Sequence, residues 1–183
     1  MSQKSTTPIR FEASLETVVT TTIVRMPGEA SQLLPSRGQV AVNGFLNGHA
    51  FQSVIEPDGR RGHWIKVDDD LRRAAGLSVG DAVDITVEPA QEWPEPEVPA
   101  DFADALASAP QRIQVIWEDI TPMARWEWVR WINATANPST RQTRVEASLS
   151  KMDDGKRRPC CFDLSSCTDT TVSRSGKLRD TGR

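Results

Sequence analysis

The chain is poor in cysteine and histidine, the residues from which disulfide frameworks and many metal sites are built. It holds three cysteines, Cys160, Cys161 and Cys167, and two histidines, His49 and His63, which lie far from them in sequence. An odd number of cysteines crowded near one end does not make a disulfide framework, and structural zinc usually takes four ligands. We therefore expect reduced thiols and no metal ion. An oxidation-sensitive pair of adjacent cysteines is the weaker alternative.

Long hydrophobic runs are also missing. The opening MSQKSTTPIR lacks the apolar stretch of a secretory signal, and no apolar run is long enough to cross a bilayer. The sequence therefore predicts a cytoplasmic protein that does not enter a membrane. Its formal net charge of -3 gives no overall field that would attract nucleic acid or anionic lipid. Binding to an anionic partner would have to come from a local cluster of basic residues.

None of the common catalytic motifs occurs. The sequence has no nucleophile motif, phosphate-binding glycine loop, zinc-binding H-E-x-x-H or dinucleotide fingerprint. His49 follows a predicted turn and His63 opens a predicted strand, so both are expected at the surface or in turns. The run Asp68-Asp69-Asp70 has the chemistry for a hard cation, but it opens a predicted helix, where capping is the preferred interpretation. We expect no cofactor and favour a protein that is not an enzyme.

What the chain does contain, over residues 9–88, is the pattern of a small β-barrel. Apolar and polar residues alternate in RFEASL and VDITVE, the period of strands with one buried face. Asn47-Gly48 separates two β-rich runs and favours the positive φ values of a two-residue hairpin turn. Short helices are predicted over 27–34 and 68–75, the second ended by Gly76. Many short strands with turn signals between them predict a closed barrel or a sandwich.

The strings RGQVAVNGFLNGHAF and GRRGHWIKVDDDLRRAAGLSVGDAVDITVE resemble DUF1905, a family of unknown function whose members form AbrB-like double-split β-barrels. The part LRRAAGLSVGDAVDITVE carries most of the resemblance, which spans residues 8–89. The resemblance implies a closed barrel that acts as a scaffold or as a homodimerisation unit.

A segment rich in proline and acidic residues, PAQEWPEPEVP over 89–99, follows the barrel. Repeated prolines favour extended geometry, so a semi-rigid linker is the main interpretation and a surface loop wrapped on the barrel the alternative. Helical periodicity begins after it, with one helix opened by Thr121 and the last one by a capping box of Ser139 and Gln142.

The fold class expected is therefore α+β, a small closed barrel followed by a small helical domain. The expected parts are a disordered N-terminus over 1–8, the barrel over 9–88, the linker over 89–99, the helical domain over 100–158 and an irregular tail over 159–183.

The helical part has a resemblance of its own. One stretch is similar to the YdeI/OmpD-associated, bacteriocin-protection-like family: DITPMARWEWVRWINATANPSTRQTRVEASLSKMDDGKRR. The shared pattern is a helix that ends in W-I-x-x-A, a break in the helix, then T-R-x-x-R, and G-K-R at the end. These positions are Trp131, Ile132, Thr140, Arg141, Arg144, Gly155, Lys156 and Arg157. The sequence departs from the usual pattern at Thr135. No catalytic residue is established for the family, so the resemblance implies none here.

The helical domain also carries the densest group of basic residues. They are Arg141, Arg144, Lys151, Lys156, Arg157 and Arg158. Because the guanidinium fork suits phosphate and carboxylate, we expect a non-enzymatic binding or stress-protection module that presents this group to an anionic partner, a protein or a nucleic acid. An alternative is that the acidic linker pairs with the basic residues, which would make them structural.

A second hypothesis is a small-molecule binding protein with a tryptophan-lined groove between barrel and helices. The candidate lining residues are Trp64, Trp117, Trp126 and Trp128. Tryptophans at helical spacing form core more often than pocket, so this hypothesis ranks below the first.

Overall fold

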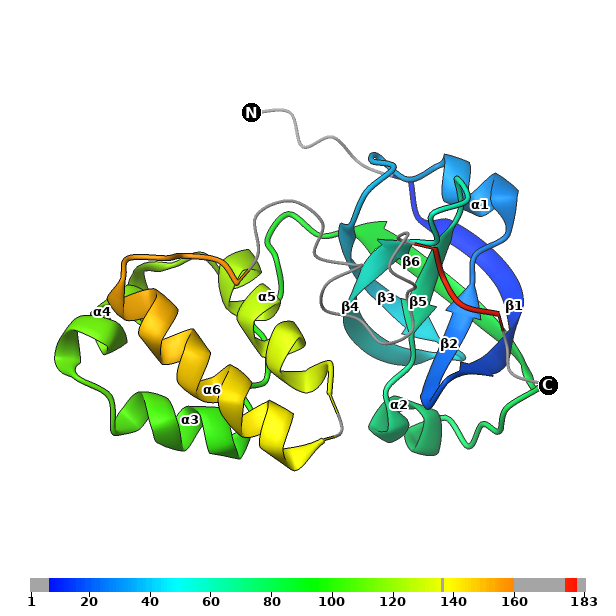
Figure 1. Cartoon of the computed structure of the whole chain (residues 1–183). Helices are drawn as coiled ribbons and strands as arrows, with labels where there is room; N and C mark the ends of the chain where they lie inside the picture. The colour runs from blue at the N-terminus through cyan, green and yellow to red at the C-terminus, as the bar shows by residue number, and fades with distance from the viewer. Residues whose placement is uncertain (1–6, 136, 160–176, 181–183) are drawn as a thin grey trace, which may run out of the picture. The chain divides into compact units, whose positions relative to one another are not determined.

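The chain forms two compact units. The structure, a computed structural model, describes residues 7–135, 137–159 and 177–180 (Figure 1). The first unit runs to Trp93 and includes the described segment 177–180, and the second begins at Pro94. The expectations for residues 1–6 and 160–176, which include those for the three cysteines, lie outside the described residues. Within the described part of the chain, no helix has the length and apolar character needed to cross a bilayer.

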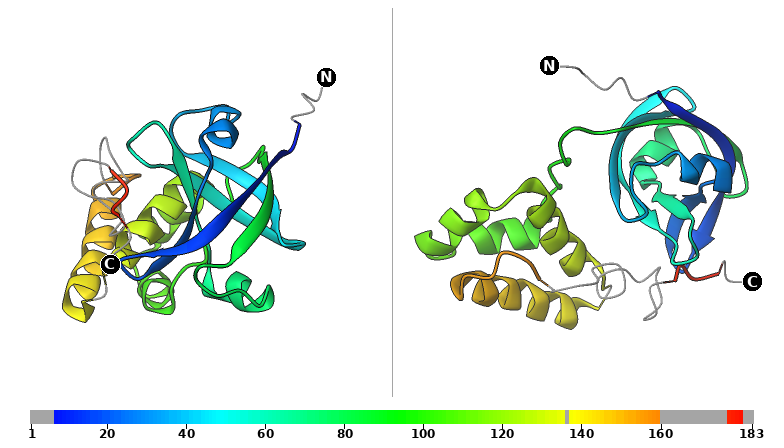
Figure 2. Two further views of the ribbon diagram at one scale, coloured as in Figure 1. Left: turned by 90° about the vertical axis from the view of Figure 1, so that its right-hand side faces the viewer. Right: turned by 90° about the horizontal axis from the view of Figure 1, so that it is seen from above.

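The first unit is a closed antiparallel barrel, as predicted. Going round the barrel the strand order is β1-β2-β5-β4-β3-β6, and the closure is visible along the barrel axis (Figure 2). The strands are β1 (Ile9–Val18), β2 (Thr21–Arg25), β3 (Val40–Leu46), β4 (His49–Pro57), β5 (His63–Lys66) and β6 (Ala82–Pro89). Every strand has two neighbours, although β4 pairs with β5 only at Glu56 and Pro57.

The β3–β4 hairpin is the element that the sequence specified most sharply. Asn47 and Gly48 have φ values of 46° and 85°, as a type I′ turn requires. The Asn47 side chain also accepts a hydrogen bond from the Asp84 amide at 2.8 Å, which ties the turn to β6. The predicted hairpin is confirmed.

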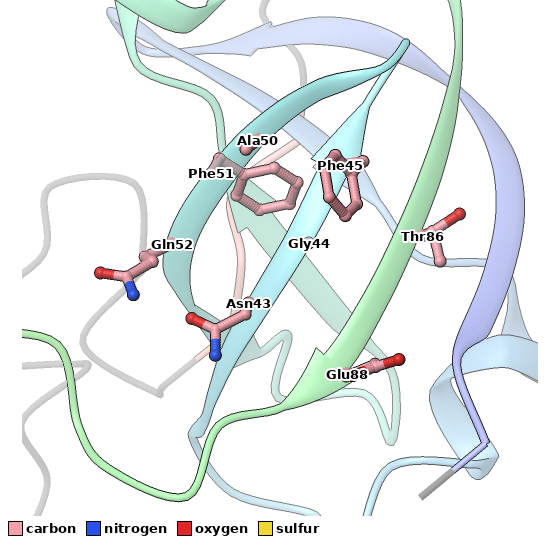
Figure 3. A pocket seen from close by; sticks show the side chains of 8 residues that line it. All are labelled: Asn43, Gly44, Phe45, Ala50, Phe51, Gln52, Thr86 and Glu88. Carbon is pink, nitrogen blue, oxygen red and sulfur yellow. The ribbon is translucent and has the colours of Figure 1, made fainter.

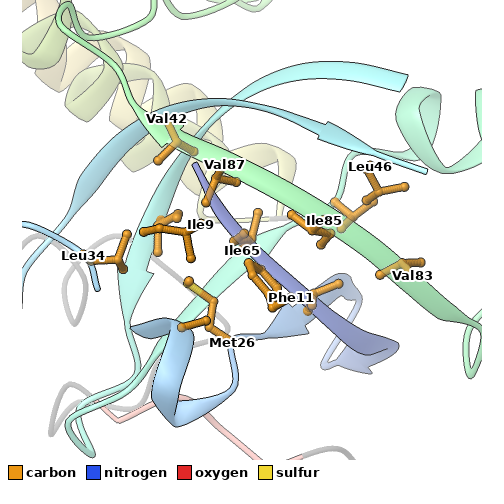
Figure 4. Packing of buried hydrophobic residues seen from close by; sticks show 14 of the residues in the cluster. Ile9, Phe11, Met26, Leu34, Val42, Leu46, Ile65, Val83, Ile85 and Val87 are labelled. Atoms are coloured by element: carbon orange, nitrogen blue, oxygen red, sulfur yellow. The ribbon is translucent and has the colours of Figure 1, made fainter. Parts of the chain in front are cut away.

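The interior of the barrel is filled by the inward faces of its strands (Figure 4). On β6, Val83, Ile85 and Val87 are at most 1% exposed, while Asp84 and Glu88 on the opposite face of the strand are exposed. The alternation predicted for this strand is therefore confirmed. Side chains that alternate in and out in this way leave the polar positions of the barrel on its outer surface.

Two short helices, α1 (Gly28–Gln32) and α2 (Asp69–Ala74), lie over opposite ends of the barrel (Figures 1 and 2). Gly76, with a φ of 65°, follows the end of α2 as predicted. Asp68 occupies the N-cap position, but its side chain makes no capping hydrogen bond, so that part of the prediction is wrong. The next two acidic residues pair instead with arginines one turn later, at 3.5 and 3.1 Å.

The described residues of the second unit form four helices: α3 (Ala100–Ala107), α4 (Gln111–Asp119), α5 (Pro122–Asn133) and α6 (Pro138–Asp153). Thr121 caps α5 by accepting a hydrogen bond from the Ala124 amide, as predicted. The capping box at Ser139 is wrong, because Asn137 is the cap of α6 and accepts from the Ser139 and Thr140 amides. Ser139 therefore lies inside the first turn of the helix.

The four helices enclose a separate apolar core. Trp128, Ile132 and Met152 are fully buried there, with Phe102 of α3 packed edge-on against Trp117 of α4 at 5.2 Å between ring centroids. Each unit therefore has its own hydrophobic core, which is the property that defines a domain.

Candidate functional site

The two arginines of the T-R-x-x-R motif lie in the first half of α6 and point to the end of α5. Arg144 donates to the Trp131 carbonyl at 2.6 Å, and Arg141 donates to the Asn133 side-chain oxygen at 2.9 Å. The last carbonyls of a helix have no partner within it and carry partial negative charge. The motif thus supplies donors that satisfy the C-terminal end of α5 and join it to α6.

Three of the six basic residues that were predicted to bind a partner form ion pairs with carboxylates of the same unit. Arg141 holds Asp101 of α3 through two hydrogen bonds of 2.6 and 3.0 Å, and this hydrogen bonding lowers the pKa of Asp101. Arg157 forms an ion pair with Asp119, the last residue of α4, with 2.8 Å between Nη2 and Oδ2. These pairs tie α6 and the residues after it to α3 and α4, so the interpretation of a structural role fits Arg141 and Arg157.

The third pair joins Arg158 to Glu127, with 3.3 Å between Nε and Oε2. The Glu127 side chain is 0% exposed, and neither of its oxygens has a hydrogen-bond partner among the described residues. Burial raises the pKa of Glu127, while the charges of Arg158 and Arg130 oppose the shift. A carboxylate without solvent depends on such neighbouring charges to stay ionised.

The other three basic residues, Arg144, Lys151 and Lys156, have no carboxylate partner in the described part of the chain. Arg144 and Lys151 both lie over the Trp131 ring, with their charged groups 5.5 and 4.9 Å from its centroid. Lys151 also donates to the Pro159 carbonyl at 3.0 Å. Cation–π contacts and backbone carbonyls orient these charges without neutralising them.

The end of α6 fixes Lys156 beside this group. Gly155 has a φ of 82°, its amide donates to the Met152 carbonyl, and the Lys156 amide donates to the Lys151 carbonyl. This pair of hydrogen bonds is the Schellman arrangement that ends many helices. The G-K-R finish therefore brings the Lys156 backbone back to the last turn of α6 and leaves its side chain exposed. We call Arg144, Lys151 and Lys156 the unpaired cation group.

The barrel carries an open hollow of about 540 Å³ on its surface (Figure 3). It lies over β3, β4 and β6, with the rings of Phe45 and Phe51 on neighbouring strands. Phe45 is 56% exposed, so its ring forms part of the outer surface of the barrel. The remaining lining residues are Asn43, Gly44, Ala50, Gln52, Thr86 and Glu88.

The two units match two family models. Residues 11–87 match a domain of unknown function, DUF1905, and residues 95–155 match the family described as bacteriocin-protection, YdeI or OmpD-associated. The chain therefore carries two regions in tandem, one similar to the DUF1905 family and one similar to the YdeI/OmpD-associated family. Both resemblances inferred from the sequence are therefore confirmed. No curated protein matches the chain in sequence.

The tryptophans proposed to line a groove are divided between the two domains. Trp64 belongs to the DUF1905 domain and is 1% exposed, and Trp128 of the YdeI/OmpD-associated domain is 0% exposed. Trp117 and Trp126 are half-buried, with Arg130 over the Trp126 ring at 4.9 Å. Trp64 and Trp128 thus have almost no surface that a ligand could touch, and the hollow described above contains no tryptophan.

The DUF1905 domain also holds a polar pair that sequence reasoning missed. His63 is 2% exposed, so the prediction that it lies at the surface or in a turn is wrong. Its Nε2 donates to the Gly38 carbonyl at 3.1 Å, which leaves Nδ1 to accept from the Ser31 hydroxyl at 2.7 Å. Ser31 is itself 1% exposed. Both groups are sealed from solvent, so the pair fastens α1 to β5 and does not form an accessible nucleophile.

The remaining histidine and the acidic clusters add no further site. His49 is exposed at the start of β4, in agreement with the sequence. Among the residues that the structure describes, no three His, Cys, Asp or Glu side chains gather closely enough to hold a metal ion.

Proposed function

We propose that this protein is a non-enzymatic binding module whose helical domain contacts an anionic partner through Arg144, Lys151 and Lys156. The observation that carries the proposal is the division of the six basic residues into two sets. Arg141, Arg157 and Arg158 face carboxylates of their own unit, whereas the unpaired cation group has none among the described residues.

The surroundings of this group suit an anion with a planar or delocalised charge, such as a phosphate of a nucleic acid. Arg144 presents a planar fork, the two lysines are point charges, and the Trp131 ring lies against the charged groups of Arg144 and Lys151. The family description, bacteriocin-protection, supports a protective role under stress for this binding.

The test is binding of a fluorescein-labelled DNA duplex, followed by anisotropy over a range of salt concentrations. The triple variant Arg144→Gln, Lys151→Gln, Lys156→Gln should weaken binding and make the plot of log K against log salt less steep by about 3. A matched control, Arg10→Gln, Arg61→Gln, Lys66→Gln, removes three exposed charges from the barrel. It should retain nearly all of the affinity.

Equal losses in the two triple variants would show that only net charge matters, and the proposal would fall. Absence of binding by the unmodified chain to both the DNA duplex and inorganic polyphosphate would also refute it. Far-UV circular dichroism of each variant establishes that the comparison is between folded proteins.

A second candidate function, binding of a small molecule, is favoured by the hollow around Phe45. Its volume of about 540 Å³ lies within the range of ligand pockets, and amide side chains of Asn43 and Gln52 stand beside the aromatic rings. A thermal-shift screen of metabolites against the full chain and against Phe45→Ser tests it. If the stabilising compounds raise the melting temperature of both proteins equally, the hollow around Phe45 is not their binding site.

A further inference from the structure

A small apolar cluster lies outside the barrel, separate from the main core. It consists of Val18, Ile23 and Trp64 from three strands, together with Leu178 from the far end of the chain, and each of the four is at most 1% exposed. Ile23 precedes Val24, whose side chain belongs to the barrel interior. Since successive side chains of a strand point to opposite faces, Ile23 faces outward. Leu178 therefore covers an apolar spot on the outer wall.

Segment 177–180 is held there by its backbone as well as by its leucine. The Leu178 amide donates to the Asp58 carbonyl at 2.9 Å, and Arg25 donates to the Arg179 carbonyl at 3.1 Å. Asp180 adds an exposed ion pair with Arg60 at 3.7 Å. The segment, red in Figure 1, lies against β2 and β5. We call the surface made by Val18, Ile23, Trp64, the Asp58 carbonyl and Arg25 the leucine socket.

We propose that the leucine socket is a peptide-recognition site. Its ligand is an extended segment with a central leucine and a carboxylate two residues later, and segment 177–180 is that ligand bound within the same chain. The contacts are local: one buried side chain, one hydrogen bond between backbone groups, one hydrogen bond from the Arg25 side chain to a backbone carbonyl, and one charge pair. None of them needs the covalent connection to the barrel. Hydrogen bonds to the peptide backbone supply affinity and the buried leucine supplies specificity, a division of roles that other peptide-recognition sites share.

A segment of the same chain competes with a free peptide for the leucine socket. A segment joined to its site competes at an effective concentration in the millimolar range, roughly, for a linker of moderate length. The same peptide added in solution should therefore bind poorly while Leu178 occupies the socket, and well once Leu178 has been removed. A difference of about tenfold or more is expected when the tethered segment is bound most of the time.

The experiment uses the full chain with Leu178→Ser and a fluorescein-labelled peptide of sequence RSGKLRDTGR, residues 174–183 of this chain. Fluorescence anisotropy should show saturable binding to Leu178→Ser and binding weaker by about tenfold or more to the unmodified chain. A peptide with serine in place of leucine should not bind. Because the barrel core does not include Leu178, the variant is expected to fold. If it does not, Leu178→Ala serves as the receptor.

Two further variants, made in the Leu178→Ser background, locate the site. Arg25→Gln removes the donor to the Arg179 carbonyl and should weaken peptide binding severalfold. Arg10→Gln removes an equal charge from the exposed side of β1 and should leave it unchanged. Failure of the peptide to bind a folded receptor, or equal binding to the unmodified chain and Leu178→Ser, would overturn the proposal. Neither result bears on the anion-binding proposal, which concerns the other unit.

Discussion

Replacing Arg158 with alanine should leave the Glu127 carboxylate buried without its ion-pair partner. Glu127 is fully buried and lies 3.3 Å from Arg158, which is itself 51% exposed. Removing one member of a fully buried pair costs about 3–5 kcal/mol, and a surface pair contributes about 0–1 kcal/mol. Because water screens the exposed arginine, we expect Arg158→Ala to lower the free energy of unfolding of the helical unit by about 2 kcal/mol near neutral pH.

The loss should depend on pH in a defined direction. Burial already raises the pKa of Glu127, and loss of the arginine raises it further. A carboxyl group whose pKa is higher in the folded state destabilises the fold above that pKa, and the penalty disappears when the group takes up a proton. The difference between Arg158→Ala and the unmodified chain should therefore be large at about pH 8 and shrink toward about pH 5.

Urea denaturation followed by tryptophan emission measures this loss, because four of the six tryptophans lie in the helical unit. The control is Glu127→Gln, in which the added change Arg158→Ala should cost less than about 0.5 kcal/mol because no buried charge remains. A loss in Arg158→Ala that is the same at every pH, or the same in the Glu127→Gln background, would refute the reasoning.

Three other perturbations test the barrel, each by thermal or urea unfolding. Gly44→Ala would place a Cβ 2.4 Å from the Thr86 carbonyl oxygen, and should cost about 1–3 kcal/mol; a neutral effect would contradict the tight strand contact. Val19→Asn should stabilise the barrel by about 0.5–1 kcal/mol, because Val19 is an exposed β-branched residue at a φ of 59°; a loss of stability would show that the turn is not strained. Burial lowers the pKa of His63, helped by the charge of Arg37 and opposed by the hydrogen bond with the Gly38 carbonyl. Barrel stability should therefore fall as pH drops below about 6.5, and His63→Gln should flatten this dependence.

The barrel could be predicted because its signals are local. The Asn47-Gly48 turn and the alternation along β6 each depend on a few neighbouring residues, and both are present as expected. Gly44 gives no such signal, because the Thr86 carbonyl that excludes a side chain belongs to a strand far away in sequence. The same is true of His63, whose partners Ser31 and Gly38 become neighbours only when α1 lies over the barrel end.

In the candidate site, too, contacts between residues far apart in sequence could not be predicted. The sequence indicated the six basic residues as one group, but it could not tell which of them would meet a carboxylate. Asp101 is 40 positions from Arg141, and Glu127 is 31 positions from Arg158, so the pairs exist only in the folded unit. Leu178 is a comparable case, since one leucine in a polar tail carries no periodic signal although it covers Trp64.

The most direct test of the anion-binding account is a titration of the ¹⁵N-labelled full chain with inorganic polyphosphate, observed through the indole and backbone amide resonances. The account predicts that the Trp131 indole and the amides of Lys151 and Lys156 shift together in a saturable manner. Shifts centred on the paired residues Arg141 and Arg157, with Trp131 unaffected, would contradict it.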